Sequence, residues 1–253
     1  MPTHFFGDTT VLLGRSMRHI TRSLDTIITV SIMPIALMLL FGYVFGGAIR
    51  AGSHHYVNYL LPGILLITVA MSISYAALRL FADLQSGIFE RFQSLPIARS
   101  SVLWAHVLTS VVSTLISLVL VVLAAVAMGF RSGASAAAWL AVAGIMVLFT
   151  LAVTWIAVIA GLSAKTVEGA GAFSYPLVFL PFISSAIVPT ATMPGPVRAF
   201  AAHQPVTPIV NTIRDLFTLR PVSAAIWPAL AWCLGILAVA SALALAAYRR
   251  KLT

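Results

Sequence analysis

Six long stretches of the chain are almost free of charged residues, and shorter polar segments separate them. They run over about Ile27–Gly46, Asn58–Leu78, Val102–Gly129, Ala138–Leu162, Gly171–Val188 and Ile226–Ala247. A helix of about 20 apolar residues crosses a hydrocarbon core of roughly 30 Å. The stretches are continuous, whereas strands of a membrane β-barrel alternate in polarity. The pattern therefore predicts an all-α polytopic membrane protein with six transmembrane helices, forming one transmembrane domain over residues 1–253.

The N-terminal residues 1–25 have a different pattern. Apolar residues recur at near-helical spacing over 5–24, and Arg15, Arg18 and Arg22 share the opposite face. This predicts an amphipathic helix that lies in the membrane interface with its cations toward the lipid headgroups. A soluble surface helix is the alternative.

Between the second and third stretches, residues 83–96 form a polar segment with one apolar helical stripe. The stripe contains Leu84, Ile88, Phe92 and Leu95. Asp83 is suited to cap the start of such a helix, and Pro96 disfavours helical backbone at the residue before it. The segment therefore predicts a short amphipathic helix on the cytoplasmic side.

Prolines mark the last third of the chain. Pro176 and Pro181 interrupt the fifth stretch, and residues 189–225 are rich in proline but too apolar for a solvated loop. We expect 189–225 to form short re-entrant or interfacial helices that fold against the outer side of the bundle. Near the start of the second stretch, Tyr56 and Tyr59 indicate an interfacial aromatic belt.

Composition and charge agree with a membrane protein. Hydrophobic residues make up 60% of the 253 positions and charged residues 8%, whereas a soluble domain carries about a quarter charged residues. The net charge of +9 would suggest nucleic acid in a soluble protein, but here we expect no nucleic-acid partner, because cations gather where helices leave an anionic bilayer. With six spans, ten of the 15 Lys and Arg residues fall on one side. This predicts that both termini are cytoplasmic.

The sequence lacks the residues that several classes of function require. No ionisable residue lies in the middle of a stretch, which disfavours a proton-driven transporter, although an uncharged sodium site is still conceivable. No two stretches offer facing histidines for haem or metal, and no nucleophile and base form a hydrolytic set. The chain has no G-x-x-x-x-G-K-[ST] phosphate loop. We therefore expect no catalytic residue, no cofactor and no metal in this chain. The one cysteine, Cys233, is interpreted as a packing residue.

Three blocks of sequence carry a resemblance that covers essentially the whole chain. They are Tyr59-Leu-Leu-Pro-Gly63, Gly87-Ile-Phe-Glu-Arg-Phe-Gln-Ser-Leu-Pro-Ile-Ala-Arg99, and the outer Met193-Pro194 with Gln204-Pro-Val-Thr207 and Arg214. With these blocks the chain resembles the permease subunits of type-2 ATP-binding-cassette exporters, especially the daunorubicin-resistance type of drug and lipid exporters. One departure is Gln204-Pro205, where the family often has Asn-Pro.

The resemblance implies a half-transporter in the inner (plasma) membrane of a bacterial cell. Two permease copies, identical or related, would pair over two copies of a separate nucleotide-binding ATPase, which would bind ATP and Mg²⁺. The N-terminal interfacial helix and the 83–96 helix would contact the ATPases. The residues that this assigns to ATPase coupling are Leu84, Ile88, Phe89, Glu90, Arg91, Phe92, Leu95 and Pro96. An interfacial connector without a coupling role is the alternative for this segment.

The resemblance also implies that the first, second and fifth spans border the transport path. Adaptable methionine and aromatic side chains suit an amphipathic ligand, and the candidates for lining the path are Met33, Phe41, Met71 and Tyr75. Each could equally be an ordinary packing or lipid-facing residue. The expected function is export of an amphipathic drug, lipid or polyketide-like molecule. The alternatives are export of a polysaccharide or other polymer, and a membrane assembly factor that transports nothing.

Overall fold

The computed structural model describes residues 24–46, 56–87, 99–218 and 224–251, and every regular element in these ranges is a helix. Within these ranges, five helices are long and apolar enough to cross a membrane. They are α2 (Leu24–Leu39) with its π-helical continuation η1 (Leu40–Phe45), α3 (Tyr56–Gln85), α5 (Arg99–Ala127), α6 (Ala136–Ser163) and α11 (Ile226–Lys251). The all-α polytopic fold predicted from the sequence is confirmed.

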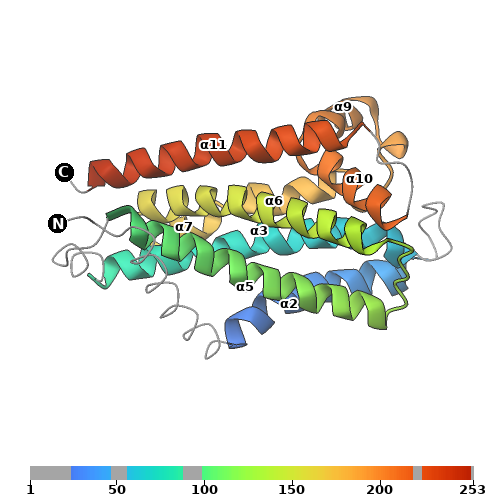
Figure 1. Ribbon diagram of the computed structural model, residues 1–253, viewed down its shortest axis with the longest axis horizontal. Coiled ribbons are helices and arrows are strands. Elements are labelled where there is room, and N and C mark those ends of the chain that lie inside the picture. The colour runs from blue at the N-terminus through green and yellow to red at the C-terminus, as the bar shows by residue number, and fades with distance from the viewer. Residues whose placement is uncertain (1–23, 47–55, 88–98, 219–223, 252–253) are drawn as a thin grey trace.

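The short helices come after α6. They are α7 (Val167–Ala172), α8 (Tyr175–Phe179), the 3-10 helices η2 (Leu180–Ile183) and η3 (Thr190–Thr192), α9 (Gly195–His203) and α10 (Val206–Phe217). In Figure 1, α9 and α10 lie together at one end of the bundle, near the start of α11. We call this the outer end, and the end where α3, α6 and α11 finish the inner end.

The fifth expected span, 171–188, is not one continuous helix, and on this point the sequence prediction was wrong. The chain there runs through α7, α8 and η2. Pro176 and Pro181 are the second residues of α8 and η2. In the first turn the missing N–H of proline is tolerated, whereas further inside a helix it removes a hydrogen bond. We call residues 167–188 the broken segment.

The broken segment nevertheless runs lengthwise beside α3. Near its start, the Ser74 hydroxyl donates to the Gly171 carbonyl at 3.4 Å. Near its end, Ala186 lies against Gly63, so closely that a Cβ on Gly63 would come within 2.5 Å of the Ala186 Cβ. Ser74 and Gly63 are separated by about 17 Å along the helix axis. The segment therefore makes a sixth pass through the bundle, and the passes alternate in direction (Figure 1).

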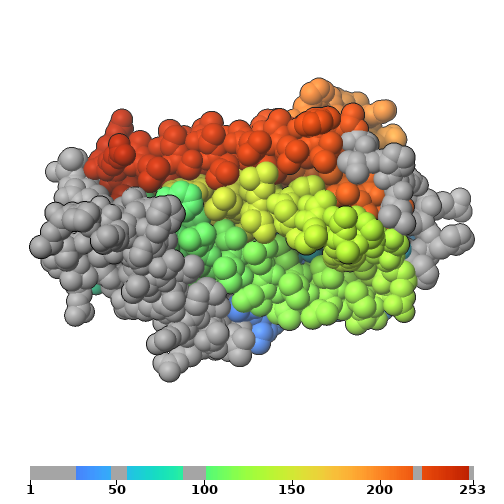
Figure 2. Space-filling model, viewed as in Figure 1, coloured from blue at the N-terminus to red at the C-terminus, as the bar shows by residue number. Residues whose placement is uncertain are grey.

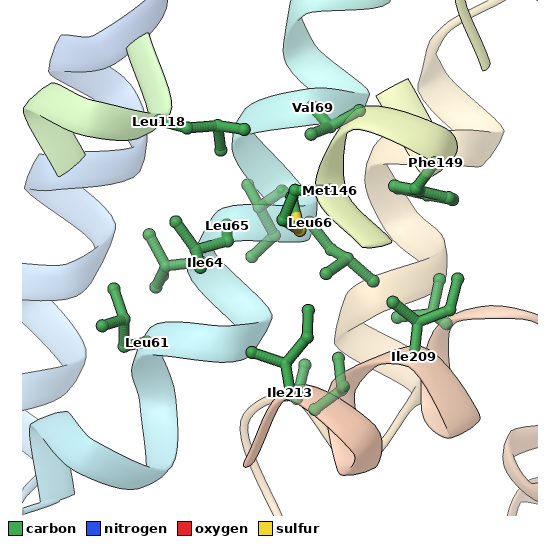
Figure 3. Close-up of a cluster of buried hydrophobic side chains, with 14 of the residues drawn as sticks. Leu61, Ile64, Leu65, Leu66, Val69, Leu118, Met146, Phe149, Ile209 and Ile213 are labelled. Atoms are coloured by element: carbon green, nitrogen blue, oxygen red, sulfur yellow. The ribbon is translucent and has the colours of Figure 1, made fainter. Parts of the chain in front are cut away.

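The core lies around α3, between α6 and the outer helix α10. Figure 3 shows apolar side chains of α3 meeting those of α5, α6 and α10. The labelled side chains are Leu61, Ile64, Leu65, Leu66, Val69, Leu118, Met146, Phe149, Ile209 and Ile213. By contrast, α11 packs along α6 and leaves much of its length at the surface (Figure 2), with Trp227, Leu234 and Val239 exposed. This exposed apolar side of α11 suits contact with lipid.

At the inner end, α3 continues beyond the Leu78 expected from the sequence and finishes at Gln85. Asp83 therefore lies in the last turn of α3 and does not cap a new helix. Two residues after the end of α3 stands Gly87, whose φ of 71° lies in the left-handed region that glycine adopts without a steric penalty.

Candidate functional site

One face of α3 changes from buried to exposed halfway along the helix. In the outer half, the residues of this face are buried: Val57, Leu61, Ile64 and Thr68. Further along, the residues are partly or fully exposed: Met71, Ser72, Tyr75, Arg79 and Ala82. Intervals of three or four positions keep all of them on one side of the helix. We call the second group the inner face of α3.

The cover over the outer half comes from the end of α2. At Gly42 in η1, a Cβ would lie 3.5 Å from the Val57 side chain and 3.0 Å from the Met128 side chain, so the backbone passes close to both α3 and α5. The other end of α2 lies farther from α3, since α2 is inclined to the bundle (Figure 1). On the opposite flank of α3, α7 lies beside Ser74 and Leu78. The inner face therefore lies between α2, which is inclined away from α3, and α7, which packs against α3.

The four predicted path residues fall into two groups. Met71 and Tyr75 lie one turn apart on the inner face, and Tyr75 is 39% exposed. Met33, on α2, is 52% exposed, and Phe41 lies in η1 with its ring 5.6 Å from that of Phe45. The structure thus brings Met71 and Tyr75 together on α3, while Met33 and Phe41 belong to the helix that crosses it.

At the outer end, polar side chains satisfy the unwound backbone of the broken segment. Gln204 donates from Nε2 to the carbonyls of Leu180 at 3.4 Å and Ile183 at 3.1 Å. The Tyr59 hydroxyl donates to the Ser185 carbonyl at 3.0 Å, and the Tyr56 hydroxyl to the Ile187 carbonyl at 2.7 Å. Non-helical backbone at membrane depth requires such partners, because no water is available there.

Arg214 completes this cluster from α10. Its Nη2 donates to the carbonyls of Ser185 at 2.8 Å and Tyr59 at 3.2 Å, and its Nη1 donates to Asn211 Oδ1 at 3.0 Å. The guanidinium also lies over the Tyr59 ring, where the π electrons favour a cation. Burial lowers the pKa of Arg214, while the charge of Asp215 opposes that shift. We call Tyr56, Tyr59, Ser185, Gln204, Asn211 and Arg214 the outer cluster.

The outer cluster shows what the sequence did and did not reveal. Tyr59, Gln204 and Arg214 belong to the blocks that carried the family resemblance, and the fold brings them together. Tyr56 is 7% exposed and Tyr59 is partly buried, so both donate into the protein and do not form the expected aromatic belt. Ser185 and Asn211 were not singled out, because short polar residues in an apolar context carry no distinctive pattern.

The predicted ATPase-coupling residues are described only at their start. Leu84 lies in the last turn of α3, partly buried against a second apolar cluster that includes Leu80, Leu103 and Tyr248. The other predicted residues lie outside the described part of the chain: Ile88, Phe89, Glu90, Arg91, Phe92, Leu95 and Pro96. The same holds for the N-terminal interfacial helix as far as residue 23.

No group of three or more His, Cys, Asp and Glu residues suited to hold a metal occurs within 24–46, 56–87, 99–218 and 224–251. His106 is buried in α5, and its Nε2 lies 3.1 Å from the Ala76 carbonyl of α3. A hydrogen bond there ties the inner parts of the two helices together.

Comparison with known proteins gives a consistent result. The family model described as ABC-2 type transporter matches residues 8–218. The daunorubicin resistance ABC transporter permease protein DrrB1 of Streptomyces coeruleorubidus is 29% identical over 235 residues, which cover 89% of this chain and 80% of that protein. The probable doxorubicin resistance ABC transporter permease protein DrrC of Mycobacterium tuberculosis (strain ATCC 25618 / H37Rv) is 26% identical over 251 residues, covering 98% of this chain and 91% of the relative.

Proposed function

The chain belongs to the ABC-2 type transporter family, and we propose that it is the membrane subunit of an ATP-driven exporter for amphipathic drugs, lipids or polyketide-like molecules. The named relatives are permease proteins of daunorubicin and doxorubicin resistance transporters. They resemble this chain over most of its length, so the proposal concerns the whole chain.

The observation that carries the proposal is the change in exposure along α3. The face that holds Val57 and Leu61 is buried at the outer end, while Met71 and Tyr75 are accessible at the inner end. An amphipathic molecule that enters from the inner leaflet would meet an aromatic ring and a thioether on this face, which both adapt to varied apolar shapes. This arrangement is the one expected of a transport path that is closed outward.

Energy would come from a partner. We infer two copies of a separate ATPase subunit that binds ATP and Mg²⁺, and a second permease copy that is identical or related. The segment from Leu84 to Pro96 joins α3 to α5 at the inner end. A displacement of this segment by the ATPase would therefore move both helices. We assign both termini to the cytoplasm and the protein to the inner membrane of a bacterial cell, as the distribution of Lys and Arg suggests.

Transport in a reconstituted system tests the proposal. The permease would be co-expressed with its partner ATPase, purified as a complex and placed in liposomes, and movement of a fluorescent amphiphile would be followed after ATP addition. We expect ATP-dependent movement that is lost with an ATPase variant unable to hydrolyse ATP. An intact complex that hydrolyses ATP and moves no amphiphile would contradict the export of amphiphiles. A chain that binds no ATPase at all would favour a membrane assembly factor.

A further inference from the structure

Two hydrogen-bonding groups on the inner face of α3 have no partner within the described part of the chain. They are the Tyr75 hydroxyl and the Arg79 guanidinium, one turn apart on the same side of the helix. Tyr75 is 39% exposed, and Arg79 is partly buried. A guanidinium offers five N–H donors in a planar fork. Together these groups present many donors to the space beside α3 and little to accept a hydrogen bond.

Arg214 differs from Arg79 in its hydrogen bonds within the described part of the chain. Arg214 uses Nη1 and Nη2 to bind two carbonyls and an amide oxygen within the protein. Arg79 makes no such contact in the described ranges, and neither Asp83 nor Glu168 forms an ion pair with it there. Within the described ranges, Arg214 is therefore held by its own chain, whereas no residue there accepts a hydrogen bond from Arg79.

The surroundings indicate what kind of ligand would fit. Ser72 donates its hydroxyl to the Thr68 carbonyl, so it adds no free donor. Met71 lies on the same face, about 12 Å from Arg79 along the helix axis, and provides an apolar surface. Arg79 directly follows the second apolar stretch predicted from the sequence, and a cation at the end of such a stretch is expected at the level of the lipid headgroups. A planar donor fork suits a phosphate or carboxylate, which can accept two parallel hydrogen bonds.

We propose that Tyr75 and Arg79 bind the anionic group of an amphiphilic ligand, with the apolar part of the ligand lying along α3 toward Met71. The ligand class is an alkyl chain or apolar ring system with a phosphate or carboxylate head. Its role as cargo rests on the proposed export function, but binding itself does not require an ATPase. The site itself favours an anionic over a cationic head, because Arg79 would repel a cation.

Photolabelling of the full chain in nanodiscs of neutral phosphatidylcholine tests the site. The probe is dodecyl phosphate with a diazirine near the end of its alkyl chain, and mass spectrometry locates the label. We expect saturable labelling of the α3 peptide that contains Met71 and Tyr75. Unlabelled dodecyl phosphate should compete, and dodecyltrimethylammonium, with the same chain length, should not. Equal competition by the cation, or labelling spread evenly over all helices, would overturn the proposal.

Variants separate a binding site from general membrane electrostatics. Arg79→Gln should weaken labelling about tenfold, since it removes a charge-assisted hydrogen bond. Tyr75→Phe should weaken it by a factor of about two to twelve, the range for a neutral hydrogen bond. Arg79→Lys should keep a substantial part of the labelling, because it preserves the positive charge. The matched control is Arg249→Gln, which removes an exposed cation near the inner end of α11. Equal losses in the Arg79 and Arg249 variants, or no loss in either, would contradict a specific site.

A second lipid composition identifies the source of the ligand. Phosphatidylglycerol included in the nanodiscs competes with the probe if the site takes anionic lipids of the bilayer, and leaves labelling unchanged if the site takes a separate amphiphile. Inorganic phosphate is tested in parallel. Displacement of the probe by inorganic phosphate at equal concentration would show that the apolar part contributes nothing and would refute the amphiphile site. Failure of ATP-driven transport alongside specific labelling would refute the export proposal and leave the binding site intact.

Discussion

The guanidinium carbon of Arg214 lies 3.8 Å from the centre of the Tyr59 ring, although 155 positions separate the two residues in sequence. The same guanidinium donates to the Tyr59 carbonyl. One cation thus holds α10 both to α3 and, through the Ser185 carbonyl, to the broken segment. The outer closure of the bundle therefore depends on polar contacts as well as on apolar packing.

Replacement of Arg214 should destabilise the protein. Arg214→Ala removes one donor each from the carbonyls of Tyr59 and Ser185, and Ser185 then keeps only the Tyr59 hydroxyl. The loss of a hydrogen bond from a charged group costs about 1.5–3 kcal/mol. We expect the midpoint of thermal unfolding in detergent to fall by roughly 5 °C. Arg214→Lys should recover only part of this, because a lysine cannot donate as a fork. Arg198→Ala, an exposed position on α9, is the control, and an equal loss there would argue against the outer cluster.

Substitution of Gly63 tests the close passage of the broken segment. In Gly63→Ala the new methyl group would overlap Ala186, whose backbone lies 2.9 Å from the Cβ position. Overpacking of this kind costs about 1–3 kcal/mol, so we expect a lower unfolding midpoint and a lower yield of folded protein. Gly144→Ala on α6 is the matched control, because nothing lies within 4 Å of its Cβ position. If both variants unfold at the same temperature, the contact between α3 and Ala186 is not as close as described.

The coupling assignment predicts a loss of transport without a loss of insertion. Phe92→Asp places a charge on the apolar stripe of the predicted coupling helix, and an anchor residue of this kind contributes about 2 kcal/mol or more to partner binding. We expect membrane levels to stay normal while the ATPase no longer drives export. The double variant Glu90→Ala and Arg91→Ala should act in the same direction through lost polar contacts. Export at the rate of the unaltered protein, with the ATPase bound, would show that the coupling helix is assigned wrongly.

The orientation of the bundle can be checked with reporter fusions. A fluorescent reporter fused after Thr253 should be active, and alkaline phosphatase at the same position inactive, if the C-terminus is cytoplasmic. Fusions after Arg131, in the connection between α5 and α6, should give the reverse pattern because this position lies at the outer end. The same pattern at both positions would rule out an alternating six-pass arrangement.

The long helices could be predicted from the sequence, because length and apolarity alone decide whether a helix can cross a bilayer. The end of α3 was placed too early, since the apolar stretch ends at Leu78 and Asp83 was interpreted as the cap of a new helix. A helix does not have to stop where the apolar stretch does. The prolines at 176 and 181 were noticed as interruptions. The division of this stretch into short helices was not foreseen, because it depends on side-chain donors such as Tyr56 and Gln204 that lie outside the stretch in the sequence.

The candidate site was also partly predictable from the sequence. Met71 and Tyr75 share a face by helical spacing alone, so their pairing follows from the sequence. That this face is buried on the outer side of Met71 and exposed on the inner side depends on where η1 approaches α3 near Gly42. No local sequence pattern encodes such an approach. Ser185 and Asn211 acquire their role only when the broken segment and α10 meet.

The side-chain donors to residues 180–187 also have a consequence for the order of biogenesis. While the ribosome is still making the chain, α3 can enter the bilayer with all of its backbone bonds formed within itself, but the broken segment cannot. The carbonyls of Leu180 and Ile183 receive their side-chain donor only after Gln204 has been synthesised. The Ser185 carbonyl can accept from the earlier Tyr59 hydroxyl, but its second donor comes only with Arg214. Each unsatisfied carbonyl in lipid would cost several kcal/mol. The broken segment must therefore reach its final position last, after the residues that follow it. Until then its carbonyls need hydrogen bonds from water at the outer surface or cover from an insertion factor.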